Sequence, residues 1–205
     1  DESLVAHLKR TVGDELEDEY RKLLAYADSE TVLTEQQKLA IMQSLYNCRI
    51  LDPACGSGAF PVGVLQQMVH ILKQIDPDNS RWKNMLLQFA IDETSEAYLT
   101  STAEERREAV ADIERAFDEN VNYPDYARKL HLIENCIYGV DIQPIAIQIS
   151  KLRFFISLVI DQKRNDNPAD NFGIRPLPNL EAKFVAANSL LGLKKTEATL
   201  FDSEE

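Results

Sequence analysis

The sequence predicts an α/β domain built on a mostly parallel sheet, and two observations support this prediction. Three short, largely apolar segments, residues 48–52, 137–141 and 183–187, have the length and composition of buried strands. Longer segments with helical spacing separate them, as parallel strands require, because each parallel connection has to cross back over the sheet. The chain has 205 residues, close to the size of one ordinary domain.

Composition and charge narrow the class of protein. The chain carries 22 Lys and Arg against 34 Asp and Glu, a net charge of −12. We therefore do not expect this chain to be a freestanding basic nucleic-acid-binding protein, because phosphate affinity comes mainly from Lys and Arg. No apolar run approaches the roughly 18 residues of a membrane span, and the acidic start, Asp1 and Glu2, is not that of a signal peptide.

Cysteine and histidine usage predicts neither a disulfide framework nor a metal site. Three cysteines, Cys48, Cys55 and Cys136, in a chain with no secretory segment point to a reducing, cytoplasmic location. No two of them have metal-ligand spacing and the histidines are scattered, so we expect no metal. Cys55 is expected to be a small packing residue rather than a nucleophile, because no base lies near it in sequence.

Residues 1–47 predict a helical lead-in with a net charge of −5. Apolar residues recur there at steps of three and four, which predicts an amphipathic helix over residues 4–27. Thr34, followed three residues later by Gln37, resembles a capping box that opens a helix running to about Tyr46.

The turn after the first strand is the strongest local feature. Pro53 stops the strand of residues 48–52, and Gly56 and Gly58 then allow a tight turn and a close approach of the backbone to a ligand. A helix is predicted over residues 59–75. A strand, a glycine turn and a helix N-terminus together form the nucleotide-type binding unit of an open α/β sheet.

Two common nucleotide motifs are nevertheless not met. The dinucleotide fingerprint needs a third glycine three residues after Gly58, and Pro61 stands there instead. A phosphate-binding P-loop is also absent from the sequence, because no glycine is followed by lysine.

The second strand ends in an acid, Asp141, followed by Pro144 and an apolar helix to about Ile160. An acid at this tip is placed to accept hydrogen bonds from ribose hydroxyls. In a compact unit it comes about 20 residues after the glycines, whereas Asp141 comes 141 − 58 = 83 residues after Gly58. We therefore interpret residues 76–136 as a helical insertion.

The insertion is predicted to hold short helices, because Ser80, Thr102 and Pro124 each resemble a helix start. The alternative is a strand over residues 89–92 that ends in Asp92. The apolar stripe continuing from the preceding residues favours a helix there, and so favours Asp141 as the second strand-end acid. A further turn region is predicted over residues 165–178, which contain three prolines.

Each strand-end residue, taken alone, has a simpler interpretation. Asp52 could only cap its turn, Asp141 could be a helix N-cap, and Asn188, after the third strand, could be a turn residue. Together they are more informative, because the carboxyl ends of parallel strands meet at one edge of the sheet, where ligands bind.

Residues 52–60 (DPACGSGAF) resemble the first motif of S-adenosylmethionine-dependent DNA methyltransferases that modify exocyclic amino groups. Residues 140–142 (VDI) resemble the second motif of these enzymes and residues 188–190 (NSL) the third. Residues 138–146 and 176–181 look most like the large adenine-N6 methyltransferases, the type IIG restriction-modification enzymes and related phage-defence methylases. The match covers roughly residues 48–75 and 137–193.

The resemblance implies the first half of a Rossmann-like methyltransferase fold (three layers, mostly parallel sheet), S-adenosylmethionine as cofactor and double-stranded DNA as substrate. In this interpretation the glycine turn cradles the methionine part of the cofactor and Asp52 lies near its amino group. Asp141 would bind the ribose hydroxyls, Ile142 would pack on the adenine ring and Asn188 would contact the adenine edge. The implied cofactor-binding residues are Asp52, Pro53, Ala54, Cys55, Gly56, Ser57, Gly58, Asp141, Ile142, Asn188 and Ser189.

Two departures from the family pattern stand out. The catalytic tetrapeptide, Asn/Asp/Ser-Pro-Pro-aromatic, is nowhere in the 205 residues, and the Phe/Tyr/Thr/Pro-rich motif expected before the first strand is not visible. In the family, the tetrapeptide accepts the N–H bonds of the amine and stacks on the flipped base. We therefore expect a fragment with no catalytic residue, contacting DNA through other parts of its parent protein. Its expected parts are a lead-in over 1–47, a cofactor-binding subdomain over 48–193 and a truncated connector over 194–205.

Two other functions remain open from the sequence. One is a non-catalytic S-adenosylmethionine-binding or scaffold module that has kept the fold without the chemistry. The other is an amino-methyltransferase that acts on cytosine N4, an RNA base or a protein glutamine, because the proline-proline motif recurs across those relatives.

Overall fold

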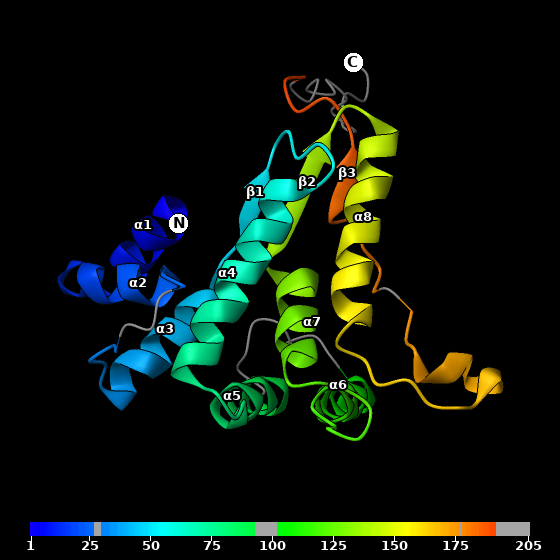
Figure 1. Ribbon diagram of the computed structural model, residues 1–205, viewed down its shortest axis with the longest axis horizontal. Helices are drawn as coiled ribbons and strands as arrows, with labels where there is room; N and C mark the ends of the chain where they lie inside the picture. The colour runs from blue at the N-terminus through cyan, green and yellow to red at the C-terminus, as the bar shows by residue number, and fades with distance from the viewer. Residues whose placement is uncertain (27–29, 93–101, 177, 192–205) are drawn as a thin grey trace, which may run out of the picture.

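The computed structural model describes residues 1–26, 30–92, 102–176 and 178–191 (Figure 1). Its centre is a parallel sheet of three strands in the order β1-β2-β3, which confirms the predicted α/β class with a parallel sheet and is compatible with a Rossmann-like fold. Each strand lies within its predicted segment: β1 is Ile50–Asp52, β2 is Ile137–Asp141 and β3 is Phe184–Ala186.

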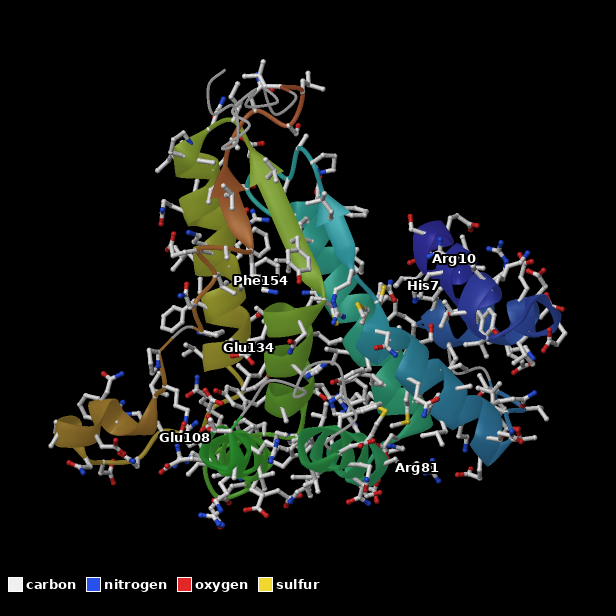
Figure 2. All side chains as sticks on the ribbon, turned by 180° about the vertical axis from the view of Figure 1, so that it is seen from behind. His7, Arg10, Arg81, Glu108, Glu134 and Phe154 are labelled. Atoms are coloured by element: carbon white, nitrogen blue, oxygen red, sulfur yellow. The ribbon has the colours of Figure 1, made fainter. Side chains whose placement is uncertain are left out.

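Two helices follow the first two strands and pack against one face of the sheet (Figure 1): α4 (Ala59–Ile75), with the predicted bounds, and α8 (Pro144–Val159). Gly139 is needed on this face, because a Cβ there would lie 2.7 Å from the Phe184 ring. The Phe184 ring in turn packs against the Phe154 ring, with 4.8 Å between ring centroids. Phe154 comes from α8 (Figure 2). Leu51 and Val185 point to the other face and are exposed, so the described residues form two of the three expected layers.

The single helix predicted over residues 4–27 is wrong. The chain forms α1 (Glu2–Thr11), a 3₁₀ turn (Asp14–Leu16) and α2 (Glu17–Leu24). Gly13, with φ +149°, breaks the helix between them, and the Tyr20 hydroxyl donates to its carbonyl at 2.9 Å. Both helices bury their apolar residues in one core, so the spacing of apolar residues continues across the break.

The helix α3 (Glu35–Asn47) begins as predicted. The Thr34 side chain accepts from the Gln37 amide, and the Gln37 side chain accepts from the Thr34 amide, which completes a capping box.

The described part of residues 76–136, the predicted insertion, forms three helices: α5 (Ser80–Ile91), α6 (Ala103–Ala116) and α7 (Asp125–Asn135). The prediction of Thr102 as the N-cap of α6 is confirmed by a capping box with Glu105. The alternative strand ending in Asp92 is excluded, because residues 89–91 belong to α5.

Ser80 is not the N-cap of α5, contrary to the prediction. It is the first residue of the helix, and Asn79 before it has φ +64°. The buried Asp76 carboxylate accepts from the Trp82 amide at 2.8 Å and from the Arg81 amide at 3.3 Å. A carboxylate from the preceding turn thus satisfies helix amide groups that a cap would otherwise bind.

A buried arginine near the end of residues 76–136 binds the start of the same segment. Arg128 of α7 is fully buried and donates to the Asp125 carboxylate at 2.6 Å and to the carbonyls of Asp76 and Pro77. It therefore connects α7 to the loop that follows α4.

The connection from α8 to β3 contains two short 3₁₀ turns within Pro168–Gly173, in the predicted turn region, and Asn171 and Phe172, where the two turns meet, have positive φ. In the described ranges, no helix has the length and apolar character needed to cross a membrane. Residues 194–205, expected to be a connector, lie outside the described residues.

Candidate cofactor-binding site

The three strand tips lie at one edge of the sheet, at the top of the molecule in Figure 1. The register pairs Asp52 of β1 with Gly139 of β2, and Asp141 with Ala186 of β3. The β1–α4 turn, the β2–α8 connection and the residues after β3 therefore meet there.

The two glycines of the first turn are required for different reasons. Gly56 has φ +54° and Gly58 has φ +82°, in the left-handed region that favours glycine. A Cβ on Gly56 would meet no atom within 4 Å, so this side of the turn is open to a ligand. A Cβ on Gly58 would lie 2.6 Å from the Ser150 hydroxyl, so this glycine lets α8 pack directly on the turn.

Asp141 connects the second strand tip to the glycine turn. Its Oδ2 accepts from the Gly56 amide at 2.9 Å, and its Oδ1 accepts from the Gln143 amide at 2.8 Å. The N-cap of α8 is Gln143, not Asp141. Each carboxylate oxygen keeps a further lone pair, so Asp141 can still accept two hydroxyl hydrogen bonds.

The other two strand-end residues make local turn contacts. Asp52 Oδ1 accepts from the Ala54 amide at 3.1 Å, and Asn188 Oδ1 accepts from the Leu190 amide at 3.0 Å. These contacts match the simpler interpretation of both residues, and they leave the second oxygen of Asp52 available.

The third motif reaches the first through Ser189, whose hydroxyl donates to the Pro53 carbonyl at 2.9 Å. The structure thus connects all three motifs, by Gly56 with Asp141 and by Ser189 with Pro53. Ile142 follows Asp141 at this edge and is 67% exposed, so its side chain is free to contact a ligand.

The N-terminus of α4 offers amide donors to this edge. The helix has no side-chain cap, and in the described part of the chain the amides of Ser57, Ala59 and Phe60 donate to no protein acceptor. Free amides at a helix N-terminus attract anions, here with the help of the helix dipole.

Cys55 is buried under the turn. Burial raises the pKa of its thiol, and the neighbouring Ser150 side chain only partly offsets this. The thiol therefore stays protonated at neutral pH, which supports a packing role.

Sequence reasoning missed Ser150 as a member of this site. Its side chain is fully buried on α8, in line with Ile147, Phe154 and Leu158, and its hydroxyl donates to the Gly56 carbonyl at 3.0 Å. The sequence does carry a signal for it, because a small polar residue stands where the helical spacing places a buried apolar one.

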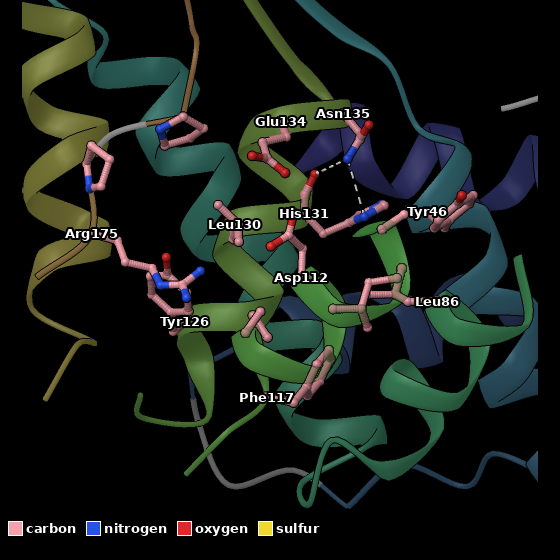
Figure 3. A pocket seen from close by; sticks show the side chains of 16 residues that line it. Tyr46, Leu86, Asp112, Phe117, Tyr126, Leu130, His131, Glu134, Asn135 and Arg175 are labelled. Atoms are coloured by element: carbon pink, nitrogen blue, oxygen red, sulfur yellow. Dashed lines mark hydrogen bonds between the residues drawn. The ribbon is translucent and has the colours of Figure 1, made fainter. Parts of the chain in front are cut away.

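A separate cavity of about 450 Å³ is lined by residues of α5, α6 and α7 (Figure 3). The helices α5 and α6 lie at the end of the molecule opposite the strand tips (Figure 1). Its lining includes Tyr46, Leu130 and His131, none of which was predicted as a site residue. The His131 ring stacks on Tyr46 with 4.7 Å between centroids, and Asn135 contacts its Nδ1 at 3.3 Å (Figure 3).

Burial lowers the pKa of His131 to about 3, with a smaller effect of the Arg49 charge. Between that value and its unfolded pKa of about 6.5, the unfolded chain binds a proton that the folded chain does not. We expect the unfolding free energy to fall by about 1 kcal/mol from this group between pH 7.5 and pH 5.5. His131→Phe, which keeps a ring on Tyr46, should remove that part of the pH dependence in urea unfolding. An identical pH dependence in both proteins would contradict a neutral buried His131.

The chain is similar to one curated protein, named "Putative type II restriction enzyme and methyltransferase RM.MjaORFECS2P", from Methanocaldococcus jannaschii. The two are 30% identical over 175 residues, which cover 82% of this chain. The chain spans only 11% of the length of that relative. No family model matches the chain, and no solved structure matches it. The chain is thus related to a protein named as a type II restriction enzyme and methyltransferase.

Proposed function

We propose that this chain is the S-adenosylmethionine-binding portion of a DNA methyltransferase of a restriction-modification system. The single observation that carries the proposal is the hydrogen bond from the Gly56 amide to Asp141, which joins a glycine turn to an acid at adjacent strand tips. The name of the relative supports the same class of enzyme.

The residues at the strand tips suit the chemistry of this cofactor. Asp141 has two lone pairs left for the ribose hydroxyls, and the exposed Ile142 side chain offers an apolar surface to the adenine ring. The amides of Ser57, Ala59 and Phe60, which have no acceptor among the described residues, suit the carboxylate of the methionine part. Asp52 suits its ammonium group. The cofactor, when bound, supplies a methyl group on a positively charged sulfur.

We further propose adenine N6 in double-stranded DNA as the methyl acceptor, on the resemblance of residues 138–146 and 176–181 to the adenine-N6 enzymes. The residues that would accept the N–H bonds of the amine are not among these 205, so the catalytic groups are assigned to other parts of the protein. The name of the relative favours an enzyme over a non-catalytic scaffold.

Thermal unfolding tests the cofactor assignment. At about 100 times its dissociation constant, a ligand stabilises the folded state by about 2.7 kcal/mol. For a chain of this size the expected rise in Tm with S-adenosylmethionine, or with its demethylated product S-adenosylhomocysteine, is therefore roughly 5–11 °C. NAD at the same concentration should leave Tm unchanged. A rise with NAD, or none with either S-adenosyl compound, would contradict the proposal.

A further inference from the structure

We propose that Ser150 is a positioning residue of this site, whose hydroxyl orients the Gly56–Ser57 peptide so that the Ser57 N–H faces the ligand carboxylate. This inference rests on the proposed function, and it adds a residue outside the three motifs. Ser150 contacts no ligand itself in this arrangement.

The orientation follows from one hydrogen bond and from peptide geometry. The Ser150 hydroxyl donates to the Gly56 carbonyl at 3.0 Å, so that carbonyl points toward α8. The peptide is trans and planar, and its C=O and the following N–H therefore point in opposite directions. The Ser57 N–H points away from α8 and donates to no protein acceptor within the described ranges.

The preceding peptide of the turn is fixed from the same β2–α8 unit. The Gly56 N–H donates to Asp141 at 2.9 Å, nine residues before Ser150 in the chain. Asp141 and Ser150 thus hold the amide and the carbonyl of one glycine, which has intrinsic freedom to rotate both peptides. The Cys55 thiol also contacts the Gly56 carbonyl, at 3.7 Å, but a thiol is a weak donor. Without the Ser150 hydroxyl, the Gly56–Ser57 peptide therefore loses the stronger of the two bonds that select its orientation.

Close packing explains why a serine serves at this position. A Cβ on Gly58 would lie 3.1 Å from the Ser150 Cα, so α8 and the turn are already in tight contact. A larger side chain at position 150 has no room, and alanine fits but cannot donate. Ser150→Ala therefore removes the hydrogen bond with little change in packing.

The ligand chemistry that uses the Ser57 N–H is a carboxylate. Together with the Ala59 and Phe60 amides at the α4 N-terminus, this N–H forms a donor set for the amino-acid end of the cofactor. A nucleoside that lacks the amino-acid end does not use these donors, and its affinity should not depend on Ser150.

Calorimetry with two ligands separates this role from a general structural one. For S-adenosylhomocysteine, Ser150→Ala should raise Kd about 3- to 10-fold, the range for one lost hydrogen bond. For 5′-methylthioadenosine, which has the ribose and adenine but no carboxylate, Kd should stay within about twofold of wild type. The matched control is Ser157→Ala on the same helix, where the hydroxyl donates to the Phe154 carbonyl at 2.8 Å and does not touch the turn.

An equal loss for both ligands, or no loss for either, would overturn the positioning role. If wild type binds neither ligand, the proposed function fails, and amide hydrogen exchange of the ligand-free protein still tests Ser150. Ser150→Ala should then speed exchange at Gly56 and Gly58, whose amides donate to Asp141 and Cys55, and Ser157→Ala should not. Unchanged exchange in Ser150→Ala would overturn the inference on its own.

Discussion

Replacing Asp141 by alanine should weaken S-adenosylhomocysteine binding roughly 100-fold and abolish the rise in Tm, since hydrogen bonds to a charged acceptor contribute about 1.5–3 kcal/mol each. The substitution removes both proposed ribose acceptors. It also leaves the Gly56 and Gln143 amides without their partner, so the turn itself loses a support. Calorimetry measures the loss of affinity directly.

Two further variants make this result interpretable. Asp92→Ala changes an acid at the C-terminal end of α5, away from the strand tips (Figure 1), and should bind within about twofold of wild type. Asp141→Asn keeps the volume of the side chain and one carbonyl oxygen. It replaces Asp141→Ala in the binding measurement if the alanine variant does not fold. Wild-type affinity in both Asp141 variants would mean that the carboxylate only holds the turn.

The sequence predicted those elements whose ends have a local chemical cause. The α4 bounds were correct because Gly58 and the preceding turn mark its start, and the α3 and α6 starts were correct because each capping box lies within four residues. Residue types that act on their immediate neighbours are readable from sequence.

The errors arose where distant residues decide the structure. Helical spacing continued across Gly13 because α1 and α2 bury their apolar residues in a common core, so the break was hidden in the pattern. Asp76, rather than the adjacent Ser80, satisfies the first amides of α5. The backbone carbonyl of the same Asp76 accepts from the Arg128 guanidinium, 52 residues away, and no local rule can anticipate that contact.

The candidate site also combines features that the sequence predicts with contacts between distant residues that it does not. That Asp52, Asp141 and Asn188 come to one edge followed from parallel strands alone. The bonds of Gly56 with Asp141 and of Gly56 with Ser150 span 85 and 94 residues, and only the folded chain shows them.

Replacing Arg128 by methionine should cause the largest loss of stability, about 3–5 kcal/mol, because it removes one partner of a buried ion pair. Methionine fills much of the volume of the fully buried arginine side chain, but the Asp76 and Pro77 carbonyls lose their donor. Urea unfolding at pH 7 measures the change. Arg107→Met, on the exposed surface of α6, is the matched control and should stay within about 0.5 kcal/mol of wild type.

The pH dependence of the stability lost in Arg128→Met identifies the electrostatic part of that loss. Burial raises the pKa of Asp125, but hydrogen bonds and charges of Lys73 and Arg128 outweigh it, so the pKa lies below its usual range. A lowered pKa contributes stability above the unfolded value of about 3.9, and this contribution is lost as the pH falls through the folded pKa. The difference between wild type and Arg128→Met should therefore be larger at pH 7 than in acid, and Asp125→Asn should remove that pH dependence. A difference that stays constant with pH would assign the role of Arg128 to the two carbonyls rather than to the carboxylate, and α7 would then be held to the loop after α4 without the ion pair.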